Sequence, residues 1–131
     1  MLSIYRVQDR DGRGPFRPGG LSDRWVDEDP RADERPFVNV DFPPAVFTVL
    51  YDLARRGYHV GCGFPSLEKL KRWFSSAELS KLYELGFRVV RLTVDEIVAE
   101  SETQLVFARA VPLNRGADEC FNPYGPGPIS R

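Results

Sequence analysis

The chain has 131 residues, of which 42% are hydrophobic and 28% charged, and its formal net charge is -1. This length and composition predict one soluble globular domain in the cytoplasm, and the scattered basic residues disfavour a nucleic-acid partner. No apolar run is long enough to span a membrane, so we expect no membrane partner. One histidine and two separated cysteines cannot supply a structural zinc site, and no metal is expected.

The N-terminal stretch "SIYRV", residues 3 to 7, predicts a strand because it alternates and is rich in β-branched and aromatic residues. Residues 8–44 are rich in Gly, Pro, Asp and Arg, which predicts an irregular arm. Within it, "DRDGRGPF" could bring backbone amides to a phosphate, although turn chemistry explains its glycines equally well. Four aromatic residues should pin the arm to the domain: Phe16, Trp25, Phe37 and Phe42.

Two helical regions with a short strand between them follow the arm. "PPAVFTVLYDLARRG" has apolar residues at i, i+3, i+4 and i+7, which predicts a helix that begins at proline and ends before glycine. "YHVGCGF" predicts a short strand whose glycines indicate a bulge or the close approach of another backbone. Ser66 is expected to cap the next helix, and Ser75 with Glu78 forms a capping box that opens a further short helix.

The C-terminal third predicts two strands and a loose end. "FRVVRLTV" and "QLVFARAVPL" are dense in β-branched and aliphatic residues, so each predicts a strand. The acidic stretch "DEIVAESET" between them is expected to be a solvated turn. Residues 114–131 are rich in proline and glycine, which predicts a loose tail without a regular element. The order of elements indicates a single α+β domain.

Three short blocks resemble the core blocks of ADP-ribosyltransferase-fold proteins. They are "IYRV", "YHVGCGFPSLEKLKRWF" and "ESETQLVF", and they occur in the order of that family over residues 4 to 107. The resemblance implies a small mixed or antiparallel split sheet with three helices. It also implies NAD as cofactor and a transferase that modifies a macromolecule, with a protein target as partner. Whether the chain is an enzyme stays open at this point.

On this resemblance, Arg6 would bind the phosphates or ribose of NAD, a role that suits a planar guanidinium. Ser66 would correspond to the middle motif that holds the nicotinamide side, and either Ser66 or His59, on its glycine-lined strand, would lie near the nicotinamide. Gln104 would take the position where active members most often carry glutamate, and Glu102 the position two residues earlier where some members carry a second Gln or Glu that orients the acceptor. With a register shifted by about two residues, Glu100 or Glu102 would supply the carboxylate instead. Glutamine keeps a hydrogen bond to a ribose hydroxyl but lacks the charge that stabilises a developing cation.

Each of these residues also has a plainer explanation. Arg6 can be an exposed strand arginine, Ser66 a helix cap and His59 an ordinary strand histidine. Glu100 and Glu102 can belong to a solvated acidic turn. Because side chains alternate along a strand, His59 and the cysteine three residues later are not expected to form a catalytic dyad, and that cysteine is expected to be a small buried thiol.

A second hypothesis is a protein-binding module without catalysis. An inhibitor of the kind that phages and mobile elements encode, for example against host defence, would use the aromatic-rich arm as its contact surface. Under either hypothesis, "HVGCGFPS" predicts one wall of a cleft. Its residues would be small so that a ligand or another backbone can lie against them.

Overall fold

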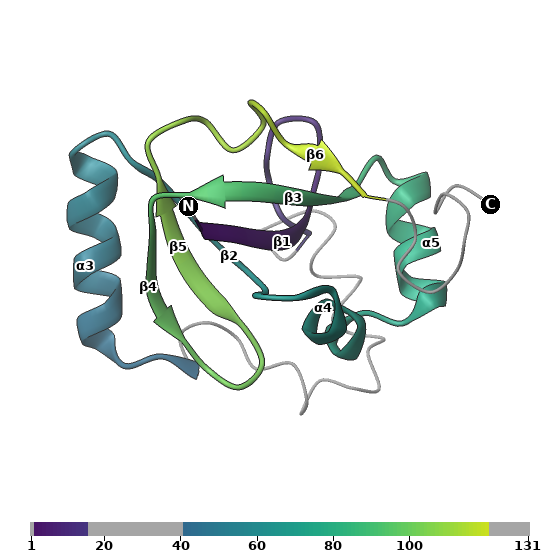
Figure 1. Ribbon diagram of the computed structural model, residues 1–131, viewed down its shortest axis with the longest axis horizontal. Coiled ribbons are helices and arrows are strands. Elements are labelled where there is room, and N and C mark those ends of the chain that lie inside the picture. Colours follow the sequence, from purple (N-terminus) through teal and green to yellow (C-terminus); the bar gives the residue numbers. More distant parts are fainter. Residues whose placement is uncertain (1, 16–40, 121–131) are drawn as a thin grey trace.

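The structure is a computed structural model that describes residues 2–15 and 41–120. These residues form a single α+β domain with three helices and two small antiparallel sheets (Figure 1), so the predicted class with a split sheet is confirmed. In chain order the elements are β1 (Leu2–Gln8), α3 (Pro44–Arg55), β2 (His59–Gly63), α4 (Leu67–Trp73), α5 (Ser76–Glu84), β3 (Arg88–Val94), β4 (Glu96–Glu100), β5 (Leu105–Arg109) and β6 (Asp118–Glu119).

The two sheets meet at one isolated bridge. One sheet has the order β1-β3-β6 and the other β2-β5-β4. Tyr5 and Phe64 exchange backbone hydrogen bonds of 2.8 and 2.7 Å, which join β1 to the residue that follows β2. On the far side of this bridge β1 and β2 are not paired as a ladder. The split therefore opens between the end of β1 and the start of β2.

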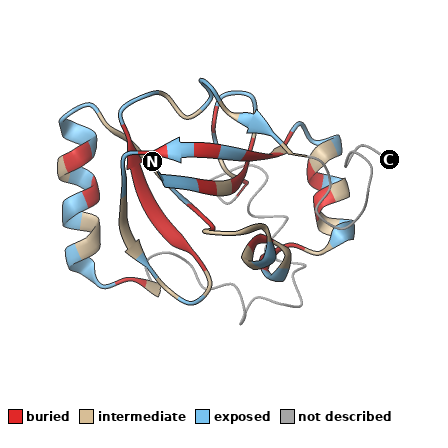
Figure 2. Ribbon diagram, in the orientation of Figure 1, coloured by how far each residue is buried: buried red, intermediate tan, exposed pale blue. Residues whose placement is uncertain are grey.

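Three clusters of buried side chains fix which way each strand faces. Ile4 of β1 packs between the sheets with Leu105 and Phe107 of β5. Val106, on the opposite face of β5, packs with Leu50 of α3. The third cluster lies under α4 and α5 and includes Val7, Phe64, Leu70, Trp73, Leu79, Leu82 and Val89. Figure 2 shows β5 as an almost continuously buried strand, since it has a core on each face.

The predicted helix caps of the two short helices are confirmed. The Ser66 hydroxyl accepts the backbone N–H of Lys69 at 3.2 Å and caps α4. Ser75 and Glu78 form the capping box that opens α5, because each side chain accepts the backbone N–H of the other residue. Such reciprocal bonds satisfy N–H groups that have no partner inside the helix.

Two strands were not predicted. β4 occupies most of the stretch expected to be an acidic turn, and it pairs with β5 through a bulge between Ile97 and Ala99. β6 lies in the segment expected to have no regular element and pairs with β3. Both are short edge strands. β6 takes its hydrogen bonds from a partner remote in sequence, whereas β4 pairs with the next strand across residues 101–104, and two of its five residues are glutamates, which are depleted in strands. Local patterns therefore carry little sign of them.

The structure describes one of the four aromatic residues of the arm, Phe42. Phe42 is buried against Leu50 and Val106, which confirms that it pins the arm to the domain. Phe16, Trp25 and Phe37 lie outside the described residues. Within residues 2–15 and 41–120, no helix is long and apolar enough to cross a membrane.

Candidate functional site

The side chain of Arg6 lies where β1 and β2 diverge. Arg6 is only 5% exposed, and its guanidinium lies 5.8 Å from the centroid of the Phe107 ring. Its three donor nitrogens bind three oxygens: Nε donates to Gln8 Oε1 at 2.8 Å, Nη1 to the Cys62 carbonyl at 2.7 Å and Nη2 to the Gly12 carbonyl at 2.9 Å. The guanidinium therefore joins β1 and β2 where backbone pairing has ended.

All three acceptors of Arg6 are neutral, which is unusual for a buried cation. Ion pairs identified among the described residues do not include Arg6. Burial lowers the pKa of Arg6, while Cys62 and the Asp9 carboxylate raise it by less. A guanidinium has five N–H donors, so Nη1 and Nη2 each keep a second N–H beyond these three bonds. The site thus holds a buried positive charge that an anion could neutralise.

A cavity of about 540 Å³ opens above Arg6. Three segments line this open cavity: the turn after β1, the start of β2 and the loop after β5. Its lining residues are Arg6, Asp11, Gly12, Arg13, Gly14, His59, Val60, Pro112, Leu113 and Asn114. This combination of a buried guanidinium with polar rim residues is suited to an anionic ligand.

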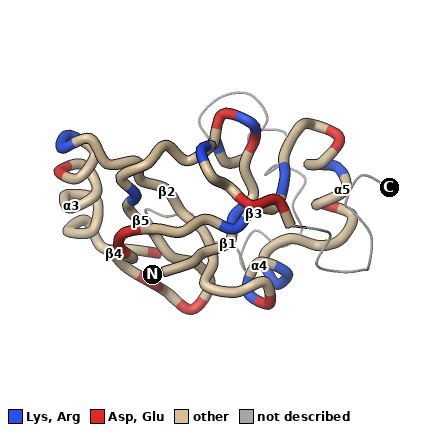
Figure 3. The backbone as a smooth tube through the Cα atoms, turned by 45° about the horizontal axis from the view of Figure 1, so that its top comes forward, with Lys and Arg blue, Asp and Glu red and all other residues tan. Residues whose placement is uncertain are grey.

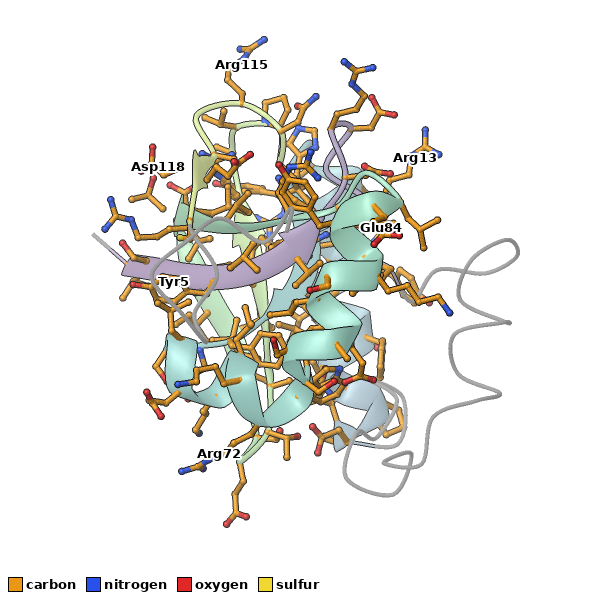
Figure 4. The ribbon with its side chains drawn as sticks, turned by 90° about the vertical axis from the view of Figure 1, so that its right-hand side faces the viewer. Tyr5, Arg13, Arg72, Glu84, Arg115 and Asp118 are labelled. Atoms are coloured by element: carbon orange, nitrogen blue, oxygen red, sulfur yellow. The ribbon has the colours of Figure 1, made fainter. Side chains whose placement is uncertain are left out.

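The turn after β1 forms the rim of the cavity. Asp9 Oδ1 accepts the backbone N–H groups of Asp11 and Arg13, each at 2.9 Å. Asp11 and Arg13 form an ion pair with 3.7 Å between Oδ2 and Nη2, and their side chains are 59% and 61% exposed. Figure 4 shows Arg13 extending outward from this turn. An ion pair this exposed is weak, so Arg13 is available to a ligand at the rim.

Two buried polar side chains hold the opposite wall. Gln8 donates through Nε2 to the Leu113 carbonyl at 2.9 Å. Arg109 donates through Nη1 to the Pro112 carbonyl at 2.6 Å and through Nε to the Thr93 carbonyl at 2.8 Å. The loop of residues 112–114 is therefore anchored to both sheets.

The glycines of β2 allow β1 to approach closely. A Cβ at Gly61 would lie 2.7 Å from Arg6 Nη1 and 3.2 Å from Phe107 Cζ. A Cβ at Gly63 would lie 2.8 Å from the Tyr5 carbonyl oxygen. The small residues of "HVGCGFPS" thus accommodate the Arg6 side chain and the β1 backbone.

The predicted site residues fall into separate places. Arg6 and His59 line one cavity, and His59 is half-buried there. Ser66 caps α4, as shown above. Glu102 is exposed in the turn between β4 and β5.

Gln104 lies in a different polar network from Arg6. It is 3% exposed and donates through Nε2 to Asp41 Oδ2 at 3.1 Å, and the same carboxylate oxygen accepts the hydroxyls of Ser101 and Thr103. Because side chains alternate along β5, Gln104 shares the α3-facing side with Val106, whereas Arg6 lies over Phe107 on the other face. The structure does not bring Gln104 into the Arg6 pocket, and its catalytic role and that of Glu102 stay predictions.

The sequence reasoning missed Gln8, Arg109 and Asn114. Gln8 lies two residues after Arg6, so strand alternation could have placed both on one face. Arg109 and Asn114 had no such signal, because their contribution depends on how the loop after β5 folds back.

Cys62 is exposed, so the prediction of a buried thiol was wrong. Gly61 and Gly63 face β1, and alternation therefore turns Cys62 to the other side of β2. Cys120 is half-buried, and burial is the main cause that raises the pKa of its thiol.

Cys62 is expected to react with iodoacetamide several-fold faster than Cys120 at pH 8. The thiolate is the reactive species, and both the burial of Cys120 and its raised pKa reduce thiolate formation and access. Peptide mapping by mass spectrometry over a time course measures both rates. Equal rates, or faster modification of Cys120, would contradict the exposure described here.

In the part of the chain that the structure describes, Arg109 is a second buried arginine with neutral acceptors, the carbonyls of Thr93 and Pro112. Basic and acidic residues are interspersed over several elements (Figure 3). Across residues 2–15 and 41–120, no group of three or more His, Cys, Asp or Glu side chains is placed to hold a metal ion.

Comparison with known proteins identifies a phage family. The family model described as "Bacteriophage T4 Y00F protein" matches residues 1–114 of this chain. Neither the curated proteins nor the solved structures contain a match. The family match covers the Arg6 pocket from the first strand to Asn114.

Proposed function

This chain belongs to the family of the bacteriophage T4 Y00F protein, and we propose that it binds NAD at the Arg6 pocket as an ADP-ribosyltransferase-like protein. The observation that carries the proposal is the buried Arg6 guanidinium, which has neutral acceptors and faces a cavity of about 540 Å³. The diphosphate of NAD would supply the missing negative charge. A planar fork of N–H donors suits phosphate oxygens.

The rest of the cavity has groups that suit a dinucleotide. Its volume lies within the range of about 300 to 1,000 Å³ that small-molecule sites occupy. Arg13 at the rim adds a second positive charge, and Asn114 and His59 offer hydrogen-bonding groups for ribose or base. These features support binding more directly than they support a chemical step.

The transfer step rests on the sequence resemblance. For Gln104 or Glu102 to act at the reacting ribose, as the resemblance implies, the nicotinamide end of the dinucleotide would have to reach the turn between β4 and β5, outside the cavity at Arg6. Gln104 lies across the sheet from Arg6, but it is within hydrogen-bond distance of the Asp41 carboxylate. The Asp41 carboxylate, next to Gln104, could stabilise the cation that forms as nicotinamide leaves. Binding and transfer are therefore tested separately.

Isothermal titration of the full chain with NAD tests the binding step. We expect Arg13→Ala to weaken NAD binding several-fold, because it removes the positive charge at the rim of the cavity. We expect Arg6→Lys to weaken NAD binding at least tenfold, because an ammonium group lacks the paired N–H donors of the guanidinium. Arg55→Ala, which changes an exposed arginine of α3, is the matched control and should bind NAD as the wild type does. Absence of NAD binding by the wild type would overturn the proposal.

Release of nicotinamide in a bacterial lysate tests the transfer step. If Gln104 or Glu102 acts in the transfer, Gln104→Ala or Glu102→Ala should reduce the release of nicotinamide while leaving NAD affinity unchanged. NAD binding without release would leave a binding protein and remove the transferase part of the proposal.

Asp11→Asn is expected to strengthen NAD binding by roughly threefold. Asp11 lines the cavity, and its negative charge opposes a diphosphate at the rim. The effect should be modest because the side chain is exposed and such charges contribute less than about 1 kcal/mol. Titration calorimetry measures it, with Asp52→Asn on α3 as the control. Weaker binding by Asp11→Asn would place the diphosphate elsewhere.

Membership of a phage family also supports the second hypothesis, a protein-binding inhibitor without catalysis. In that case a host protein should bind the intact chain and lose affinity when residues 16–40 are replaced by a glycine–serine linker. The Arg6→Lys variant should then bind that host protein normally. Dependence of host-protein binding on Arg6 would argue against a contact surface confined to the arm.

A further inference from the structure

We infer that Gln8 keeps the floor of the Arg6 pocket positively charged and thereby selects an external phosphate group, of the diphosphate type, as its counter-charge. The inference rests on the proposed function, because it concerns the same pocket. It goes beyond that function because it explains why the site keeps its positive charge: the residue that accepts the Nε–H of Arg6 is the neutral amide Gln8.

The two hydrogen bonds of Gln8 require a neutral amide. Gln8 is 3% exposed, accepts the Nε–H of Arg6 and donates through Nε2 to the Leu113 carbonyl. A carboxylate at this position could accept from Arg6, but it has no N–H for Leu113. One amide therefore orients the guanidinium and holds the opposite wall at once.

This arrangement leaves the Arg6 guanidinium hydrogen-bonded to neutral acceptors, with the Asp9 carboxylate acting on it only through space and offsetting its burial in part. Buried arginines ordinarily pair with a carboxylate, and the position next to Nε is where one would fit. The nearby acids are engaged elsewhere: Asp9 accepts two backbone N–H groups of the turn, and Asp11 pairs with Arg13 at the rim. With the amide of Gln8 in place of a carboxylate, the guanidinium keeps both its charge and the second N–H groups of Nη1 and Nη2.

The loop of residues 112–114, which forms the wall opposite Arg6, also favours an anionic ligand. Gln8 and Arg109 anchor adjacent carbonyls of the loop that carries Asn114. The carbonyls of Pro112 and Leu113 thus accept hydrogen bonds from Arg109 and Gln8, and neither is among the acceptors of Arg6. A ligand must bring the negative charge with it.

The variant Gln8→Glu tests this assignment with inorganic pyrophosphate as the probe. Glutamate has nearly the same shape but places a carboxylate against Arg6 Nε. We expect the Kd for pyrophosphate, measured by titration calorimetry at fixed ionic strength, to rise at least tenfold. The salt dependence of binding should also become weaker, because fewer net charges are neutralised.

Gln8→Met separates charge from structure. Methionine loses both hydrogen bonds of Gln8 but leaves the Arg6 charge in place. If Gln8 sets the charge, the loss of pyrophosphate affinity should be smaller in Gln8→Met than in Gln8→Glu, although Gln8→Met should unfold at a lower denaturant concentration. A purely structural role predicts the reverse order of affinities and would overturn the inference.

The remaining outcomes also decide. If Gln8→Glu does not fold because its carboxylate faces the Leu113 carbonyl, Gln8→Met decides alone: a tenfold or greater loss of pyrophosphate affinity in Gln8→Met would overturn the inference. If the wild type binds pyrophosphate but not NAD, and the two variants behave as expected, the inference stands and the proposed function fails. If the wild type binds NAD and Gln8→Glu binds it equally well, the proposed function stands and the inference fails. Failure of the wild type to bind either compound overturns both.

Discussion

Replacing Arg6 with methionine is expected to lower the free energy of unfolding by about 3 kcal/mol. The variant leaves three acceptors without their donor, two of them on buried residues: Gln8 Oε1, the Gly12 carbonyl and the Cys62 carbonyl. Each unsatisfied acceptor costs about 1 to 3 kcal/mol, and relief of the cost of burying the guanidinium offsets part of the sum. Urea unfolding followed by circular dichroism measures the change.

Arg91→Met is the matched control for this experiment. Arg91 lies on β3, directly opposite Tyr5 in the register with β1, but its side chain is exposed and pairs with Asp118 at 3.2 Å. Its replacement should leave the unfolding midpoint nearly unchanged. If Arg6→Met unfolds at the same urea concentration as Arg91→Met, Arg6 does not hold the split between the sheets as described.

Gly63→Ala is expected to destabilise the protein by about 2 kcal/mol or more, a decrease of roughly 5 to 10 °C in Tm. The new Cβ would lie 2.8 Å from the Tyr5 carbonyl oxygen and 3.0 Å from Ile4 Cδ1. The Tyr5 carbonyl accepts the N–H of Phe64, one of two hydrogen bonds in the bridge between the sheets. Because the obstacle is backbone, relief requires β1 and β2 to move apart. Differential scanning calorimetry measures the change.

Gly14→Ala provides a glycine control on the same side of the pocket. Its Cβ would lie 3.6 Å from Arg6 Nη2 and 3.8 Å from the Val7 carbonyl, which are ordinary contact distances. The Tm of the Gly14→Ala variant should stay within a few degrees of the wild-type Tm. A tolerated Gly63→Ala would mean that the two sheets are less closely joined at the bridge than the structure has them.

Arg6 has two roles in this structure, one in stability and one in the proposed binding of a ligand. Its hydrogen bonds to β2 and to the turn after β1 stabilise the split sheet. Its buried positive charge is the one that we propose a diphosphate neutralises. A substitution that removes the side chain changes both. For this reason the binding experiments rely on Arg13, Gln8 and the lysine variant of Arg6, whereas the methionine variant reports on stability.

The sequence by itself determined the elements that have local signals. The helix from Pro44, the caps at Ser66 and Ser75 and the strands around Arg6 and Phe107 follow from periodicity and capping residues within a few positions. Such features depend on hydrogen bonds between near neighbours in the chain, so a short window contains the information. The glycines of "HVGCGF" likewise indicated a close approach before the approaching group was known.

Tertiary structure alone decided the rest. β6 exists because β3 offers it hydrogen bonds from a remote position, and β4 because it pairs through a bulge with β5, the next strand in the chain. The faces of Cys62 and Gln104 follow from which side of the β2-β5-β4 sheet packs on β1 and which on α3. The pocket itself depends on Gln8 reaching Leu113, 105 positions later in the chain. No local pattern encodes such a contact, because it forms only after both sheets and the loop have packed together.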